Sequence, residues 1–445
     1  PPAGEDVITP DGTLRYHKGD VVDTVTTDED GTAKSKELYL GKYTVVETKA
    51  PTGMVINKEK HSVELTYAGQ DVAVTETATS FVNERQKVKI SLEKILEQDE
   101  TFGIGKNDEI KNISFGLYAK EDIVSSSGTA IPADGLIEII TLDENGAATA
   151  NTDLPFGSYY VKEIATDEHY ILSDTQYPFT FEYAGQDTET VEIKVNDGKP
   201  IENKLIYGSV SGKKIDENGE ALGGALIGIF KADETEFTKE HSIMTATSEK
   251  DGSFSFAKVP YGQWIVREIE APTGFVLDDT SYEVNISKNE QVIEVEIANE
   301  YVHGNIQLTK VDADYPDNKL TGATFEVYRD VNGDGKLDDG DELIGNLKET
   351  STGIYEMKEL LYGKYLVRET KAPDGFELDK GVYSVFIEND ETTYNVENKA
   401  GVGFINQAMK GNLKIKKTSS DGKVEGFTFR VTGENGYDRS FTTDK

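Results

Sequence analysis

The chain of 445 residues contains no cysteine, which excludes disulfide bonds, thiol chemistry and zinc sites with cysteine ligands. Histidine is scarce as well, and the five histidines are scattered without metal-ligand spacing or a catalytic arrangement. No pairing of a nucleophile with a base stands out. We therefore do not expect an enzyme that turns over a substrate, and the sequence requires no cofactor.

Long apolar runs and basic charge are also lacking. The longest apolar run, at about residues 221–230, is interrupted by glycines and falls short of the roughly 20 residues that span a bilayer. Lysine and arginine number 46 against 82 aspartates and glutamates, so the formal net charge is −36. This charge argues against nucleic-acid partners and anionic membranes. It favours a soluble, self-repelling surface, with divalent-cation binding as an alternative.

What the chain does contain is a recurring phrase of glycine, an aromatic residue, valine and glutamate. It reads Gly41-Lys-Tyr43-Thr-Val45-Val-Glu47-Thr-Lys-Ala50-Pro51-Thr-Gly53. The phrase returns around Glu268 and Glu369, and a looser copy around Glu163 lacks the Ala-Pro ending. Successive copies are about a hundred residues apart, which is the length of one small domain. The spacing predicts tandem domains rather than a solenoid of short repeats.

Alternating apolar residues dominate the chain, and Asp-Gly and Asn-Gly turn signals separate them. No amphipathic helix of three or more turns is apparent. The sequence therefore predicts an all-β chain of sandwiches or barrels.

Two more phrases mark where each domain, or module, starts and ends. The start phrase alternates apolar residues and ends in a lysine, as in Ile90-Ser-Leu92-Glu-Lys94. The end phrase finishes in an asparagine, as in Phe81-Val-Asn83. In the fourth module Asn398 competes with Asn406, but only Asn406 has the usual distance to the next start phrase.

These phrases divide the chain into five modules. Residues 1–86 form a module that lacks its first strands and its lysine. Residues 87–205, 206–301 and 302–409 form complete modules, the last with an acidic insertion. Residues 410–445 hold only the first strands of a fifth. Linkers of a few residues favour a fairly stiff rod.

The glutamate of the repeat is expected on the core face of each module. The aromatic residue, the valine and the glutamate alternate, so a strand places all three on one face. A lone buried charge is costly, so each glutamate needs a partner or a chemical role. The lysines and asparagines share the same phase, which gives complete sets of Lys94, Glu163 and Asn203; Lys214, Glu268 and Asn299; and Lys310, Glu369 and Asn406. Partial sets are Glu47 with Asn83, and Lys417 alone.

If the first and last strands of a module are neighbours, the lysine amine can face the asparagine carboxamide. Burial favours the neutral, nucleophilic amine and a protonated glutamate. Attack on the amide would expel ammonia and leave a Lys–Asn isopeptide bond, with the glutamate moving protons. A cross-link over 85 to 109 residues restricts the unfolded chain by roughly 4–5 kcal/mol, by analogy with disulfides. The alternative is a lysine–glutamate salt bridge, with asparagine only capping a strand end.

The acidic insertion of the fourth module fits a calcium loop. Oxygen ligands fall at the expected positions, with a glycine at position 6 and a backbone carbonyl from position 7. The ligand residues are Asp330, Asn332, Asp334, Lys336, Asp338 and Asp341. Position 12 is aspartate instead of glutamate, and flanking helices are not expected. An acidic hairpin without a metal is the alternative.

The three phrases resemble those of the Cna B-type repeats and SpaA-like pilin domains of Gram-positive surface proteins. The resemblance covers nearly the whole chain. It implies tandem prealbumin-like, reverse immunoglobulin-like β-sandwiches with self-generated isopeptide bonds at the nine residues of the complete sets. Two departures are the missing Ala-Pro ending after Glu163 and Gly212 at an apolar position of a start phrase. No sortase sorting signal is present in the sequence.

The resemblance also implies an extracellular, cell-wall-anchored parent protein, with sortase and the cell wall as partners through that parent. The leading hypothesis is a structural stalk of an adhesin or pilin. The alternative is a module that binds a host matrix protein or a glycan through inserted loops at residues 101–112 and 330–341.

Overall fold

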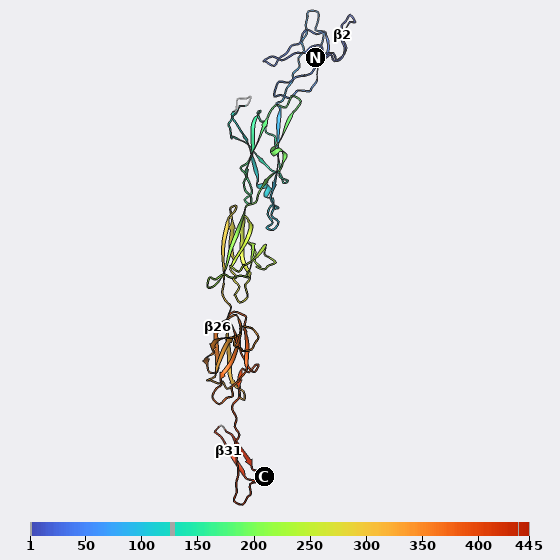
Figure 1. The fold of residues 1–445 in the computed structure, drawn as a ribbon. Helices are drawn as coiled ribbons and strands as arrows, with labels where there is room; N and C mark the ends of the chain where they lie inside the picture. The colour runs from blue at the N-terminus through green and yellow to red at the C-terminus, as the bar shows by residue number, and fades with distance from the viewer. Residues whose placement is uncertain (1, 125–129, 435, 445) are drawn as a thin grey trace.

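The computed structural model describes residues 2–124, 130–434 and 436–444. Figure 1 shows separate β-rich bodies that follow one another in sequence order, with the two termini at opposite ends of an elongated molecule. The described residues contain no α-helix and two short 3-10 turns, η1 (Glu109–Asn112) and η2 (Val195–Gly198). The prediction of an all-β chain is confirmed.

The second module is a sandwich of two sheets with strand orders β10–β5–β13 and β12–β11–β6–β9, and β14 also pairs with β5. The strands are β5 (Lys87–Leu96), β6 (Ser114–Ala119), β9 (Leu136–Thr141), β10 (Ala147–Ala150), β11 (Gly157–Ala165), β12 (Gln176–Phe181), β13 (Thr190–Lys194) and β14 (Ile201–Asn203). A separate hairpin joins β7 (Ile123–Val124) to β8 (Ala130–Ile131).

The third module repeats this plan with orders β18–β15–β21 and β17–β16–β19–β20. The strands are β15 (Tyr207–Asp216), β16 (Leu226–Lys231), β17 (Met244–Thr247), β18 (Ser253–Pro260), β19 (Gly262–Glu270), β20 (Tyr282–Ile286) and β21 (Val292–Asn299). In the third module the single strand β21 pairs with the first strand, β15. In the second module two strands, β13 and β14, pair with the first strand, β5.

The fourth module has orders β25–β26–β22–β29 and β24–β23–β27–β28, and β30 also pairs with β22. The strands are β22 (His303–Asp312), β23 (Thr324–Arg329), β24 (Glu342–Asn346), β25 (Lys348–Ser351), β26 (Ile354–Leu361), β27 (Gly363–Lys371), β28 (Val382–Ile387), β29 (Thr392–Asn395) and β30 (Phe404–Asn406).

The described residues of the two end modules contain only two-stranded sheets, with isolated bridges such as Ala3–Tyr43 in the first. The first has β1 (Val7–Ile8) with β2 (Leu14–Tyr16), and β3 (Gly41–Val45) with β4 (His61–Leu65). The fifth has β31 (Thr428–Thr432) with β32 (Asp438–Thr442). The start phrase that ends in Lys417 predicts the first strand of the fifth module, and this prediction is wrong, because residues 413–417 form no strand. In the complete modules this strand is paired on both sides, and the described residues after 410 supply no such partners.

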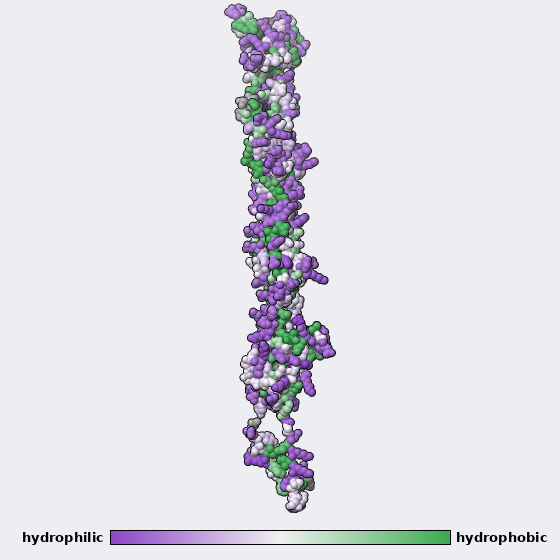
Figure 2. All heavy atoms as spheres, turned by 60° about the vertical axis from the view of Figure 1, so that its left-hand side comes forward, coloured by the Kyte–Doolittle hydropathy of each residue, from purple (hydrophilic) through white to green (hydrophobic). Residues whose placement is uncertain are grey.

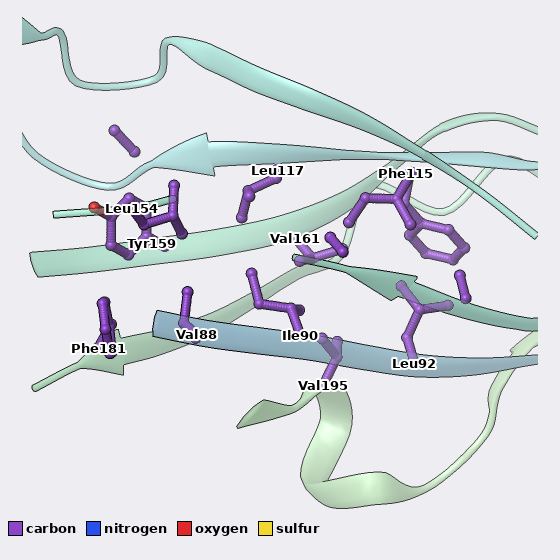
Figure 3. Close-up of a cluster of buried hydrophobic side chains, with 14 of the residues drawn as sticks. Val88, Ile90, Leu92, Phe115, Leu117, Leu154, Tyr159, Val161, Phe181 and Val195 are labelled. Carbon is purple, nitrogen blue, oxygen red and sulfur yellow. The ribbon is translucent and has the colours of Figure 1, made fainter. Parts of the chain in front are cut away.

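The core of each complete module lies between its two sheets. In Figure 3, Val88, Ile90 and Leu92 on β5 point toward Leu117 and Val161 of the opposite sheet. These alternating residues are nearly fully buried, and burial of each such side chain contributes about 1.5–3 kcal/mol. The alternation read from the sequence therefore sets which side of each strand faces the core.

The aromatic residue of the repeat is anchored in the same way in four modules. Its polar tip donates a hydrogen bond to the carbonyl four residues earlier, at 2.6 Å for Tyr159 and 2.9 Å for Trp264. Tyr43 and Tyr365 make the same bond. A tryptophan can replace tyrosine because its indole N–H is also a donor.

Gly212, which departs from the apolar pattern, is explained by its partner on β18. Gly212 lies opposite Phe254, and a Cβ at Gly212 would lie 2.0 Å from the Phe254 ring. The second module has the reverse arrangement, with Leu92 opposite Ala148. A large and a small residue therefore fill the same space from opposite strands.

Successive modules are joined closely. Residues 204–206 and 300–302 are all that separate a last strand from the next first strand. The residue two positions after each module-ending asparagine bridges back to its own module, as Leu205 does to Tyr170 and Tyr301 does to Phe275. Figure 2 shows the resulting narrow surface, on which hydrophilic residues predominate.

Candidate functional site

The first and last strands of each complete module are parallel neighbours. On these pairs the lysine lies opposite a residue of the last strand, and the asparagine follows two positions later. Lys94 is opposite Ile201, Lys214 opposite Ile297 and Lys310 opposite Phe404. Because side chains alternate along a strand, the offset of two places lysine and asparagine on the same face, within reach of each other.

The glutamate approaches from the opposite sheet, on β11, β19 or β27. The distance from the lysine Nζ to the glutamate Oε1 is 3.5 Å for Lys94–Glu163, 3.5 Å for Lys214–Glu268 and 3.6 Å for Lys310–Glu369. These six side chains are 0–1% exposed. Each module therefore contains a charged pair in a dry interior, where the charges cost free energy unless they are matched or neutralised.

The asparagine amide completes each set. Its Nδ2 donates to the glutamate at 2.9 Å in the Asn203–Glu163 pair, 2.6 Å in Asn299–Glu268 and 2.9 Å in Asn406–Glu369. The carbonyl oxygens of these asparagines are buried and have no hydrogen-bond partner among the described residues. The amide nitrogen is thus held by the carboxyl group, while the carbonyl is free to be polarised.

Burial changes the protonation of the lysines. Desolvation lowers the pKa of Lys94 and Lys214, although the nearby glutamates act in the opposite direction. The same balance lowers the pKa of Lys310 to about 8. A neutral amine, which is the nucleophilic form, is therefore accessible near neutral pH.

A further contact to the glutamate was missed by the sequence reasoning. The backbone N–H of the residue ten positions later donates to Oε2, from Ser173 at 3.0 Å and from Asp278 at 2.8 Å. Asp379 does the same for Glu369 at 2.9 Å. Asp278 also accepts a bond from the Tyr282 hydroxyl at 2.7 Å. The recurring spacing of ten was the available signal, but only the fold shows that the chain turns back onto the glutamate.

The partial sets differ from the complete ones. In the first module Asn83 Nδ2 donates to Glu47 at 2.7 Å, and no lysine of the described residues forms an ion pair with Glu47. Lys417 instead donates to the Thr418 carbonyl and lies over the Phe427 ring. A cross-linking role for Glu47, Asn83 or Lys417 stays a prediction.

Both asparagines of the fourth module have hydrogen-bond partners, but only the partner of Asn406 is buried. Asn406 contacts Glu369, whereas Asn398 donates to Asp379 at 2.5 Å and exchanges two hydrogen bonds with Ile405. Asn406 therefore occupies the position that matches Asn203 and Asn299. Asn398 ties the neighbouring loop to the last strand.

The predicted calcium loop is closed by its own hydrogen bonds. Asp330 accepts N–H groups of Gly333 and Gly335, and Asp341 accepts those of Val331 and Asp338. Further bonds within the loop join Asn332 to Asp338 and Asp334 to Lys336. No group of three or more His, Cys, Asp or Glu side chains in the described ranges is arranged to hold a metal ion. Calcium binding stays a prediction.

The other inserted loop, residues 101–112, takes part in a module junction. Phe102 and Ile104 are buried with the core of the third module, and the Phe102 ring meets Trp264 edge-on at 4.8 Å. Tyr207 of the third module also donates to Asp99 at 3.0 Å. Phe102 and Ile104 therefore pack against the neighbouring module, while Ile110 packs against the core of its own module.

The fold and the buried sets together define a tandem β-sandwich protein with a Lys-Glu-Asn set in each complete module. The chain belongs to the SpaA prealbumin-like fold domain family, whose model matches residues 11–79, 101–199, 208–301 and 304–400. The resemblance read from the three phrases is confirmed. No helix in the described part is long and apolar enough to cross a membrane.

Several solved structures are similar to this chain. The TIE protein of Bacillus anthracis has 20% identity and a TM-score of 0.49, with 86% of this chain and 66% of that chain covered. BcpA, the major pilin subunit of Bacillus cereus, has 17% identity and a TM-score of 0.33, with 73% and 100% covered. The shaft pilin SpaA of Lactobacillus rhamnosus GG has 12% identity and a TM-score of 0.20, with 47% and 99% covered. No curated protein matches.

Proposed function

We propose that this chain is a structural stalk segment of a bacterial surface adhesin or pilin-like protein, hardened by intramolecular Lys–Asn isopeptide bonds. One observation carries the proposal: three modules place a buried lysine, glutamate and asparagine together at paired first and last strands. A single salt bridge would need no asparagine. Three sets with the same offset fit a reaction between lysine and asparagine.

The bond-forming step is balanced within each set. The lysine passes a proton to the glutamate, and the neutral Nζ attacks the asparagine Cγ. The Nζ–Cγ bond forms and the Cγ–Nδ2 bond breaks. The glutamic acid gives its proton to Nδ2, which leaves as ammonia, and takes one proton from Nζ. Ammonia takes up the remaining proton and departs as ammonium, so the glutamate ends as the carboxylate that it was at the start. The reaction occurs once per module without turnover of an outside substrate.

The position of the bond gives it a mechanical role. It would join the first strand to the last strand at the module end from which the chain continues to the next module. Force applied along the chain would then pass through a covalent bond rather than through the hydrogen bonds of the sheets. This role suits a stalk and does not depend on a ligand-binding surface.

Intact-protein mass spectrometry tests the proposal. We expect the mass to lie about 17 Da below the encoded value for each ammonia lost, with three losses from the complete modules. Glu268→Ala should abolish one loss and make the third module sensitive to protease. Glu296→Ala, which removes an exposed glutamate of β21 in the same module, is the matched control and should keep all three. A wild-type mass equal to the encoded value would refute the proposal.

The family resemblance supports an extracellular location on a wall-anchored parent protein, with sortase acting through that parent. Binding of a host matrix protein or glycan is the second candidate function. The exposed acidic loop at residues 330–341 is the remaining insertion that could supply such a contact, because Phe102 and Ile104 of the other loop are buried against the third module. Loss of cell adhesion after alanine replacement in this loop, with all cross-links intact, would favour the second function.

A further inference from the structure

Thr166 lies where the second module departs from the repeat. Three residues after the glutamate, the other modules have an alanine, at Ala50, Ala271 and Ala372. In the second module this position is threonine, and Asn203 Nδ2 donates to its hydroxyl Oγ1 at 2.9 Å. The same nitrogen donates to both oxygens of Glu163, each at 2.9 Å. The threonine therefore contacts the atom that would leave as ammonia.

In the first and third modules a backbone carbonyl contacts this nitrogen, and in the fourth Asn406 Nδ2 donates to Glu369 alone among the described residues. Asn299 Nδ2 donates to the backbone carbonyl of Val276 at 2.6 Å, and Asn83 Nδ2 to that of Val55 at 2.8 Å. Both groups, the carbonyl and the threonine hydroxyl, accept an N–H of this nitrogen. Such an acceptor matters most when Glu163 protonates Nδ2, because the leaving nitrogen then carries a positive charge.

The loop that carries Thr166 is fixed on its other side. The next residue, Asp167, is buried and accepts a bond from Asn112 Nδ2 at 2.7 Å. Asp167 also accepts the backbone N–H of His169 at 3.1 Å, and its own carbonyl accepts the N–H of Tyr170 at 3.0 Å. The hydroxyl is thus held in place before any reaction, as electrostatic catalysis requires.

The amine of the second module is also less restrained. Lys214 Nζ donates to the Ile297 carbonyl at 3.2 Å and Lys310 Nζ to the Phe404 carbonyl at 3.1 Å. Lys94 Nζ is buried and has no hydrogen-bond partner among the described residues. In this module, the polar contacts beyond the glutamate are made to the leaving nitrogen rather than to the nucleophile.

We infer that Thr166 is a catalytic residue of the second module, which assists the departure of ammonia from Asn203. The hydroxyl oxygen accepts an N–H of Nδ2 in the amide and keeps accepting it in the tetrahedral intermediate, where it stabilises the positive charge that Nδ2 gains on protonation. Glu163 supplies the proton that completes ammonia, the Cγ–Nδ2 bond breaks, and the threonine keeps its own proton. The inference rests on the proposed cross-linking function.

The test follows cross-linking in each module of the full chain during cell-free synthesis. Samples are quenched in acid at intervals, digested, and scored by mass spectrometry for the cross-linked peptides of the three modules. Thr166→Val, which keeps the shape and removes the hydroxyl, should slow the second module roughly five- to tenfold, the effect of about one hydrogen bond. Thr166→Ser should restore the rate. Ala271→Val, the equivalent change in the third module, should leave all rates unchanged.

The outcomes separate this inference from the function on which it rests. Unchanged cross-linking of the second module in Thr166→Val would overturn the role of the hydroxyl while the function stands. Equal slowing by valine and serine would also overturn it, because serine keeps the hydroxyl. Absence of ammonia loss from every module of the wild-type chain would remove the proposed function itself. The third and fourth modules are internal controls, because their cross-linking shows that the chain in the same sample has folded and reacted.

Discussion

The second and third modules hold the same three buried side chains but surround them differently. In the second, a threonine hydroxyl contacts Asn203 and the lysine amine has only its carboxylate. In the third, a backbone carbonyl contacts Asn299, and Lys214 donates a hydrogen bond to the backbone carbonyl of Ile297 on β21. The repeat therefore specifies which residues meet, while each module has its own way to orient them.

The same two modules also divide core volume differently, with Leu92 opposite Ala148 in one and Gly212 opposite Phe254 in the other. The volume that the core needs at this position is thus filled jointly by the opposite residues of two strands, and not by one residue alone. A residue that seems wrong on its own strand is correct once its partner is known.

The largest effect should come from removal of a lysine. Lys214→Ala prevents the cross-link, worth roughly 4–5 kcal/mol in the unfolded chain. In the chain before cross-linking, the change also leaves Glu268 buried without its charge partner, at a cost of about 3–5 kcal/mol. Lys94→Ala should do the same in the second module. Limited proteolysis and thermal melting measure the loss, and Lys213→Ala, an exposed neighbour, is the control. Equal stability of Lys214→Ala and Lys213→Ala would contradict the prediction.

Exchange of the core pattern between the modules should have the next largest effect. Gly212→Leu forces a side chain into the Phe254 ring and should cost about 1–3 kcal/mol or more. Adding Phe254→Ala should recover part of this loss, because the pair then resembles Leu92 and Ala148. A double-mutant cycle of unfolding free energies measures the coupling. Additive losses would show that the two positions do not share one space.

The fourth module should show a pH dependence of cross-linking. Since burial lowers the pKa of Lys310 to about 8, the Lys310–Glu369 pair keeps its one shared proton below that pH and loses it above. The reactive form, a neutral amine beside a glutamic acid, holds the same number of protons as the ion pair, so the initial rate should be nearly constant below about pH 8 and fall roughly tenfold per pH unit well above it. Time courses from about pH 6 to 10 measure this, and a rate that keeps rising through pH 8 would contradict it.

A smaller effect is expected at the aromatic anchor of the repeat. Tyr159→Phe removes the hydrogen bond to the Pro155 carbonyl and should destabilise the second module by about 1 kcal/mol. Trp264→Phe should cost the third module more, since it also removes ring volume. Thermal melting of chains that carry one change each makes the comparison. A larger loss in Tyr159→Phe would reverse the expected order.

Calcium should produce the smallest change, confined to the fourth module. If the loop at residues 330–341 binds the ion, added calcium should raise the melting temperature of this module, and a chelator should reverse the shift. Asp334→Ala should abolish the response, while Asp233→Ala, a change in the third module, should keep it. Identical melting temperatures with and without calcium would support the alternative, an acidic hairpin that binds no metal.

Much of the fold and site could be read from residue patterns. The alternation of apolar and polar residues predicted the strands. Lys94, Glu163 and Asn203 lie an even number of residues from apolar core positions, so they were expected on core faces because side chains in a strand alternate. The strand expected at residues 413–417 failed for a physical reason: an isolated strand has no partners for its backbone groups. The sequence did not predict a role for Thr166, because the absence of the Ala-Pro ending was interpreted only as a weaker copy of the repeat.

The sequence by itself determined the all-β class, the tandem organisation and the identity of the residues that carry the proposed chemistry, because strand periodicity is local. The tertiary structure decided which atoms meet. The parallel pairing of first and last strands, the return of Ser173 and Asp278 to the glutamates, and the packing of Phe102 into the next module all join residues far apart in sequence or held on separate strands. Such contacts depend on how sheets stack, which no local pattern encodes.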